Sequence, residues 1–481
     1  MLTQMAGITR KLLLLSVAFG LFGGAAFGQM NTGEISGQVK DPTGAVIAGA
    51  AVEATHIATQ QKFTATVNDS GLFLLPQLPL GEYTLTVSAM GFKQAVQEHI
   101  VLHIGDHIRQ DFELALGEQS ETVTVEGSSS ILQVQSAEIK DVIQNQQVED
   151  LPLKGREFLE LTLLGEGVVS PPGGTRGDAL QQTGKLINVM GNRTGHNLFL
   201  VDGVNVTDEY FNNVVLSPST DAISEFNMLK TNYDAEFGGK SGAVVNVITK
   251  SGTNAFHGSI YEFLRNDIFD ARNFFATPGV ATPFRENQFG GTFGGPILRD
   301  KTFFFVNYEG QRTRNSLSEA FNVPTTAERT GNLAGLAKPV ASFKDPFTGI
   351  TYSGSDLNSD PNFHMSSAAN ALLNLLPLPT PGQSGANNLL AVGQQSIDTN
   401  QYNARIDHQF SMNDSAFIRV SVFDANQFDP FGSSVLNEAL LPGFGRTLRT
   451  HSVNLSAGET HTFIFVRVGG SRIYSISIVV K

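Results

Sequence analysis

Residues after position 257 alternate between polar and apolar side chains in short runs. In the run 401–411, Tyr402, Ala404, Ile406, His408 and Phe410 share a mostly apolar face, and Asn403, Arg405, Asp407, Gln409 and Ser411 share a polar face. Side chains alternate along a strand, so this pattern predicts strands with an apolar medium on one side and a polar lumen on the other. The same alternation predicts strands at 258–264, 287–294, 302–311, 416–423 and 451–458.

The connections between these runs alternate in length. The segments 296–301 and 412–414 are short, whereas 265–286, 312–400 and 424–450 are long. Outer-membrane barrels have short periplasmic turns and long external loops, so we expect the first strand to run outward. Residues 255–481 are therefore interpreted as the start of an antiparallel transmembrane β-barrel of about six strands. We expect the segment 312–400, rich in Pro, Gly, Asn and Ser, to be an external loop that faces a substrate.

Residues 31–116 carry a different pattern of short strand-like runs separated by turn residues. The runs are 34–40, 51–55, 63–67, 72–75, 81–89, 97–103 and 108–114. Runs at this spacing predict a β-sandwich. The region resembles a carboxypeptidase regulatory-like, or transthyretin-like, domain. The residues that carry this resemblance are Gly37, Val39, Gly44, Ile47, Gly49, Ala50, Val52, Gly71, Phe73, Pro79, Gly81, Tyr83, Leu85, Val87, Ala89, Gly91 and Phe92.

The first 28 residues predict a signal peptide. Arg10 and Lys11 precede an apolar run at 12–22, and small residues at 23–28 offer a cleavage site. The apolar run is much shorter than the roughly 20 residues that a membrane-spanning helix needs. We therefore expect an exported chain that enters a membrane only through paired strands, which places it in the outer membrane of a Gram-negative cell.

Residues 138–254 contain five motifs in a recognisable order. They are the segment 148–158, the segment 188–194, the strand and turn Leu200-Val201-Asp202-Gly203-Val204, the strand 223–229, and the patch 233–242 followed by the apolar strand 243–250. In this order they resemble the plug domain of TonB-dependent outer-membrane receptors of the Oar type. The resemblance implies an α/β plug, with Asp202, Gly203, Glu236, Gly238, Gly239, Lys240, Ser241 and Gly242 as its motif residues.

A linker at 117–137 separates the sandwich from the plug region. Its segment Glu121, Thr122, Val123, Thr124 and Val125 alternates Thr with Val. The segment resembles the TonB box, through which the energy-coupling protein TonB pulls on a receptor by pairing with its main chain. The alternative interpretation is a last sandwich strand followed by a plain linker.

The resemblance also implies 22 barrel strands, a terminal aromatic residue recognised by the barrel-assembly machinery, and contact with outer-membrane lipid. This chain ends instead in Lys481. An open sheet of about six strands would present unpaired edges to lipid. We therefore expect an incomplete barrel, from a truncated or frame-shifted coding sequence.

Composition narrows the chemistry. The chain has no Cys, which excludes disulfides and thiolate metal sites, and its 32 basic and 45 acidic residues give a net charge of −13, which argues against nucleic-acid binding. No catalytic constellation is present, so we expect no enzyme activity and no cofactor. The run Gly239-Lys240-Ser241 imitates a phosphate-binding loop, but Asp234 stands where that loop requires Gly.

For several other polar residues a purely structural role is the alternative to a functional one. His99, His103 and His107 recur every four residues, but they fall in strands and turns, so we expect no metal site. Asp202 reads as a turn residue rather than a ligand. Glu236 and Lys240 are either solvated charges or, as the resemblance implies, contacts between plug and barrel.

The sequence thus predicts a mainly β protein with a sandwich, an α/β plug and an incomplete antiparallel barrel. The leading functional hypothesis is a TonB-dependent receptor for active uptake of an unidentified external ligand. The alternatives are a surface adhesion or structural protein, and an exported module that binds carbohydrate or protein.

Overall fold

The structure is a computed structural model. It describes residues 32–117, 122–124, 138–151, 153, 156–170, 187–207, 214, 216–233, 237–271, 283–336, 342–385, 387–431, 442–463 and 474–480. The expected signal peptide lies outside these residues. Within them, no helix is long and apolar enough to cross a membrane.

Two sheets face each other in the N-terminal part, which we call the sandwich (residues 33–116, with 122–124). In the first, β1 (Gly33–Lys40) lies between β4 (Leu72–Leu78) and β7 (His107–Arg109), and β8 (Phe112–Glu113) also pairs with β1. The second has the order β3 (Lys62–Thr66), β2 (Ala51–His56), β5 (Gly81–Ser88), β6 (Gln94–Leu102) and β9 (Thr122–Thr124). Alternate residues of β1, β2 and β5 are buried between the sheets, because each sheet has one face in water.

A second sheet system follows, which we call the plug (residues 139–249) after the expectation from the sequence. Its strands lie in the order β10 (Ile139–Gln144), β15 (Ile223–Thr231), β16 (Val244–Thr249), β13 (Leu198–Val201) and β14 (Val204–Asn205), and only β13 and β16 are parallel among these pairs. Both faces of β16 are buried, which explains its unbroken apolar run. Short elements surround the sheet: α2 (Asn145–Asp150), the 3₁₀ helices η2 (Phe158–Leu164), η3 (Thr194–His196) and η4 (Thr220–Ala222), and the strand pair β11 (Val168–Val169) and β12 (Asn188–Val189).

The long strands that follow the plug form one curved antiparallel sheet, which we call the wall (its strands lie between residues 257 and 480). Within the described residues it has seven strands in chain order. They are β17 (His257–Asn266), which η5 (Asp267–Phe269) follows, β18 (Phe284–Leu298), β19 (Thr302–Phe321), β22 (Leu389–Ser411), β23 (Asp414–Asp429), β24 (Arg446–Phe463) and β25 (Tyr474–Val480). The expected alternation is present: Phe303 and Phe305 are buried on the plug side, whereas Val306 and Ile406 are exposed on the other.

The loop expected at 312–400 is wrong in its bounds, because the connection between β19 and β22 spans only residues 322–388. β19 and β22 stay paired as far as Phe321 and Leu389. Residues 312–316 and 394–400 are mostly polar on both faces, with pairs such as Arg314 and Asp398, so no apolar alternation marked them. Beyond them, Leu317, Phe321 and Leu389 pack in a small apolar cluster. The connection at 322–388 is also not structureless, since it contains α3 (Thr326–Arg329), β20 (Ser342–Lys344), β21 (Thr351–Ser353), η6 (Leu357–Ser359) and α4 (Ser367–Leu375).

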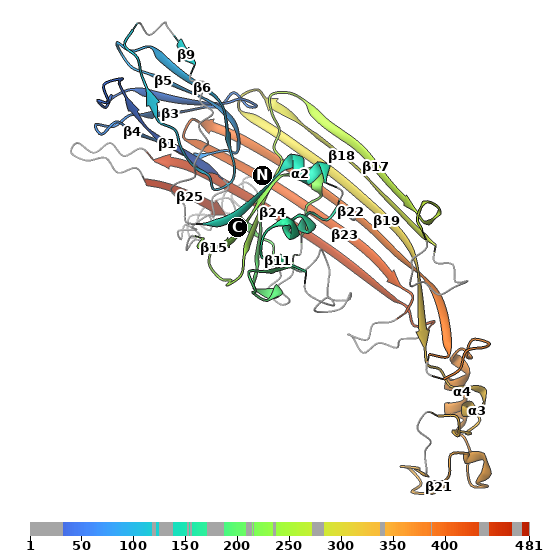
Figure 1. Ribbon diagram of the computed structural model, residues 1–481. Coiled ribbons are helices and arrows are strands. Elements are labelled where there is room, and N and C mark those ends of the chain that lie inside the picture. The colour runs from blue at the N-terminus through green and yellow to red at the C-terminus, as the bar shows by residue number, and fades with distance from the viewer. Residues whose placement is uncertain are drawn as a thin grey trace, which may run out of the picture.

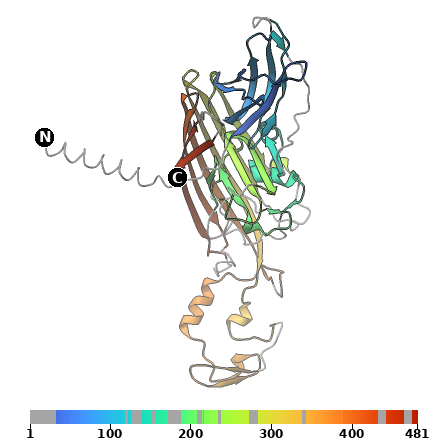
Figure 2. The same ribbon diagram turned by 90° about the vertical axis from the view of Figure 1, so that its left-hand side faces the viewer.

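The three parts are arranged along the wall. The sandwich lies at the end of the short turns, and the segment 322–388 extends from the opposite end (Figure 1). The plug lies against one face of the wall (Figure 2). Asn254, which leads from plug to wall, joins all three at the sandwich end: its backbone N donates to Ala58 O (3.0 Å) and its side-chain Nδ2 donates to Asp300 Oδ1 (2.7 Å).

Candidate functional site

The turn Asp202-Gly203 connects β13 to β14 and projects toward the wall. Both residues have positive φ (49° and 75°), as a two-residue type I′ hairpin requires, and Gly adopts this conformation without strain. The Asp202 side chain is almost completely buried. Its carboxylate accepts hydrogen bonds from Thr249 N (3.0 Å) and Thr249 Oγ1 (2.9 Å) at the end of β16, which fix its direction.

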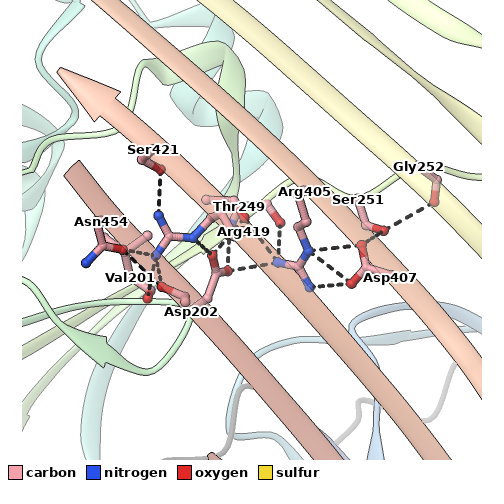
Figure 3. A network of polar contacts seen from close by, with 11 residues as sticks. Val201, Asp202, Thr249, Ser251, Gly252, Arg405, Asp407, Arg419, Ser421 and Asn454 are labelled. Carbon is pink, nitrogen blue, oxygen red and sulfur yellow. Dashed lines mark hydrogen bonds and ion pairs between the residues drawn. The ribbon is translucent and has the colours of Figure 1, made fainter. Parts of the chain in front are cut away.

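Two arginines of the wall complete the surroundings of this carboxylate (Figure 3). Arg405 of β22 donates from Nη1 to Asp202 Oδ1 (2.9 Å), and Arg419 Nε of β23 lies 2.6 Å from Asp202 Oδ2. Both arginines occupy the face of the wall that looks toward the plug. Arg405 also binds Asp407 (2.8 Å), while Arg419 donates to Ser421, Asn454 and Ser456. The plug and the wall are thus joined by a buried network of two positive and two negative groups.

The electrostatics favour an ionised Asp202. Burial alone would raise the pKa of this carboxyl, but Arg405, Arg419 and the hydrogen bonds from Thr249 outweigh burial and leave the pKa below its ordinary value. A cavity of about 350 Å³ adjoins the network where sandwich, plug and wall meet, and Asp202, Thr249, Arg405 and Asp407 are among its lining residues. The network therefore has space beside it into which side chains and water can move.

A second polar network joins plug and wall around Arg156, which precedes η2. Its guanidinium forms an ion pair with Asp221 of η4 and lies 3.6 Å from Glu309 Oε2 of β19. Tyr261 of β17 donates to the same Glu309 oxygen (2.8 Å), and Arg156 stacks 4.8 Å from the Tyr261 ring centroid. Ion pairs and hydrogen bonds around Arg156 therefore hold the first part of the plug against β17 and β19 of the wall.

Further polar contacts lie between these two networks. Ser219 Oγ donates to Asn307 Oδ1 (2.8 Å), and Gln401 Nε2 donates to Ser217 O (2.6 Å). Ser217 also donates to Glu157, whose pKa is raised by burial. The interface is thus mainly polar, whereas the plug has an apolar core of its own, which Phe423 is the only wall residue to join among those that the structure describes.

The structure places the motif residues 238–242 at the other end of β16 from Asp202. Tyr233 Oη donates to Gly242 O (2.7 Å), and Ser241 Oγ lies 3.1 Å from His196 Nδ1. An added Cβ at Gly242 would lie 2.7 Å from His196 O, so this position requires Gly. The patch therefore packs within the plug, and the structure does not bring it to the Asp202-Gly203 turn. Glu236 lies outside the described residues.

The segment expected to bind TonB is described only at Thr122, Val123 and Thr124. These residues form β9, which pairs in parallel with β6 through Gln94, Ala95 and Val96. This is the position that a last sandwich strand would take. Glu121 and Val125 lie outside the described residues.

The three histidines at 99, 103 and 107 do not converge, because each ring contacts a different carboxylate. His99 binds Glu82, His103 Nδ1 lies 2.8 Å from Glu225 of the plug, and His107 Nδ1 lies 2.8 Å from Glu34. Among the residues that the structure describes, no group of three metal-ligating side chains converges on one position.

The His103 contact is part of the docking of the sandwich on the plug. Ile104 N donates to Glu225 Oε1 (2.6 Å), and the buried Lys140 donates to Gly105 O (2.9 Å) and Asp106 Oδ1 (3.2 Å). Two ion pairs therefore hold the loop 103–106 on β10 and β15: His103 with Glu225, and Asp106 with Lys140.

Sequence reasoning missed most of the plug-to-wall residues. Arg405 was placed on the polar face of its strand, but neither it nor Arg419, Arg156 or Glu309 was singled out. A usable signal existed, because a charged residue on the inward face of a membrane strand needs a partner. The partner could not be identified, since Asp202 and Arg405 are 203 positions apart in the sequence.

Comparisons with known proteins match two parts of the chain to family models. Residues 248–465 match the outer membrane beta barrel domain, and residues 34–115 match the carboxypeptidase regulatory-like domain. Over 320 residues the chain is 29% identical to the TonB-dependent transporter Oar of Myxococcus xanthus, an alignment that covers 63% of this chain and 29% of that protein. The chain thus spans less than a third of the length of that relative.

The chain also aligns with solved structures of outer-membrane proteins, at low sequence identity. The outer membrane transporter YddB from Escherichia coli aligns with a TM-score of 0.40 at 12% identity, covering 67% of this chain and 37% of that one. The siderophore receptor PirA from Acinetobacter baumannii aligns with a TM-score of 0.33 at 18% identity, covering 68% and 46%.

Proposed function

We propose that this chain, a mainly β, TonB-dependent receptor-like protein of the Gram-negative outer membrane, takes part in the active uptake of an external ligand. In this proposal the plug closes the lumen beside the wall. An external ligand binds the plug and the long connections, and TonB pulls on residues 121–125. The pull displaces the plug from the wall and opens a path. The ligand itself is unidentified.

The observation that carries the proposal is the polar contact between plug and wall. Asp202 binds Arg405 and Arg419, Arg156 lies beside Glu309, and Ser219 binds Asn307. Water can replace the partners in such an interface, whereas separating a fused apolar core would expose its surface at roughly 25 cal/mol per Å². A self-contained plug with a hydratable boundary suits repeated displacement.

The position of β9 supports a role for residues 121–125 as the segment that is pulled. Thr122, Val123 and Thr124 form a strand held through the main chain at one side of the second sandwich sheet. A strand held in this way can exchange its pairing for a strand of another protein. The segment is short, so the exchange costs few hydrogen bonds.

Binding to TonB tests this proposal directly. We expect the purified chain to bind the periplasmic domain of TonB, and deletion of residues 121–125 to lower that affinity at least tenfold. Deletion of residues 126–130, which shortens the linker by the same five residues, is the matched control and should leave the affinity unchanged. Equal binding by the chain lacking 121–125 would reject the assignment of this segment.

A surface adhesion role is the second candidate. The segment 322–388 extends away from the wall, and Phe347 at the β20–β21 turn is 96% exposed. Removal of residues 342–353 should then abolish cell-to-cell or cell-to-matrix adhesion while TonB binding persists. Adhesion that survives this removal would exclude the segment as an adhesive element.

A further inference from the structure

The outward face of the wall can be reconstructed from the strand register. Tyr308 pairs with Gly291 on one side and Tyr402 on the other, and Tyr402 pairs with Val422. Val306, two residues earlier on β19, is exposed and pairs with Phe293 and Ala404. Their neighbours Phe305 and Asn307 are buried on the plug side, so the even-numbered residues of β19 face away from the plug.

This outward face has an apolar band with two polar limits. At the sandwich end the band ends where the exposed Leu298 of β18 pairs with Thr302 of β19, whose hydroxyl contacts His408 (2.7 Å). At the other end the aromatic rings of Phe289, Tyr308 and Tyr402 follow one another, with centroids 6.2 and 5.0 Å apart. Arg312 and then Arg314 come next on the same face of β19.

The height of the band fits the membrane. Nine residues of β18 separate the exposed Leu298 from Phe289 in the aromatic girdle, and strands that rise about 3.4 Å per residue at a tilt of 35–45° climb roughly 22 to 25 Å over that distance. The apolar band of an outer-membrane barrel is about 25 Å tall, flanked by aromatic residues. Arg312 and Arg314 therefore lie at the level of the outer-leaflet headgroups, just beyond the aromatic girdle.

Three arginines gather at this level. Arg285 of β18 is exposed and pairs in register with Arg314 of β19. Arg312 stacks 5.6 Å from the Phe289 ring centroid and donates to Thr399 O (2.6 Å) and Asn400 Oδ1 (2.7 Å). Arg314 binds Asp398 through two hydrogen bonds of 2.7 and 3.1 Å. Arg285, Arg312 and Arg314 with Asp398 carry a net charge of two positive units.

We propose that Arg285, Arg312 and Arg314 form a binding surface for phosphorylated lipid headgroups of the outer leaflet. Guanidinium groups bind phosphate oxygens in pairs, and here the contacts to Asn400 and Asp398 hold two of them in fixed directions. The aromatic girdle sets their depth, so a phosphate attached to acyl chains reaches them while those chains lie against Val306 and Tyr402. Asp398 competes with the phosphate for Arg314.

The test uses the full chain in phosphatidylcholine nanodiscs that contain diphosphoryl lipid A or its dephosphorylated form. Native mass spectrometry measures the bound lipid. Each basic residue near a charged membrane surface contributes about a factor of five in affinity, so R312Q/R314Q should bind diphosphoryl lipid A roughly 25-fold more weakly. D398N should bind it more strongly, which a merely structural role for Asp398 would not produce.

The matched control is R265Q, since Arg265 lies at the same end of the wall but on the opposite face by register, and it should bind like the unaltered chain. Unchanged binding by R312Q/R314Q, weaker binding by D398N, or equal binding of the dephosphorylated lipid would overturn the proposal. Displacement of lipid A by an equal concentration of inorganic phosphate would also overturn it, because the surface would then recognise a free anion.

Discussion

Asp202 is the residue that ties the plug most closely to the wall. Its carboxylate is buried and receives Thr249, Arg405 and Arg419 together. Removing one partner of a buried charge pair is costly, about 3–5 kcal/mol, because the other charge stays buried without compensation. Arg405 retains Asp407, and Arg419 retains its hydrogen bonds to Ser421, Asn454 and Ser456, so the lower end of this range applies to a substitution at Asp202.

We therefore expect D202N to weaken the docking of the plug by about 3 kcal/mol, which corresponds to roughly a hundredfold loss of amide protection. Hydrogen exchange of the β13 and β16 amides measures this loss. D111N, at an exposed carboxylate of the sandwich, is the matched control and should leave exchange unchanged. Protection of β13 and β16 that survives D202N would show that the Asp202 network does not hold the plug.

His103 gives the sandwich-to-plug contact a pH dependence. The hydrogen bond to Glu225 raises the pKa of His103 in the folded state, although burial and Lys140 act against this, while Asp106 adds to it. A raised pKa means that the contact contributes fully below the ordinary pKa of about 6.5 and loses strength as pH rises through the folded value. The docking of the sandwich on the plug should therefore loosen as pH rises through the folded pKa of His103, and distances between spin labels on the sandwich and the plug measure this loosening. H103Q should remove this pH dependence, and an unchanged profile in H103Q would assign it to another group.

At the scale of elements, the pairing of β9 with β6 holds the segment that we propose TonB pulls. Residues 95 and 123 are partners in the register, and the chain has no Cys of its own. Ala95→Cys with Val123→Cys should form a disulfide under oxidation and lower TonB binding at least tenfold, and a reductant should restore it. Each single Cys variant is the control. Full TonB binding by the oxidised double variant would show that β9 need not leave β6.

The elements also show where sequence reasoning works. Alternation identified the strands that separate the plug from an apolar medium, such as 401–411, because there each face has its own polarity. It failed at 312–316 and 394–400, where both faces are mostly polar and pairs such as Arg314 with Asp398 satisfy one another, and at 389–392, where the apolar run is unbroken and does not alternate. It also could not join Asp202 to Arg405 and Arg419, since that contact is set by how the plug lies against the wall.

At the scale of the whole molecule, the contacts define three bodies, which are the sandwich, the plug and the wall, and polar contacts join one body to the next. The sandwich and the plug each have an apolar core, and they meet through the loop 103–106 and Glu225. The plug meets the wall mainly through charges and hydrogen bonds. A pull on the sandwich side should therefore separate the plug from the wall before either core unfolds.

Single-molecule pulling on the chain in a supported membrane tests this claim most directly. A handle attached at Thr122→Cys applies force along the direction from which TonB would pull. The account predicts that β9 first leaves β6 and that the next event is release of the plug from the wall, at a force that D202N lowers and D111N leaves unchanged. Unfolding of the sandwich core before the plug is released, or a release force that D202N does not alter, would contradict it.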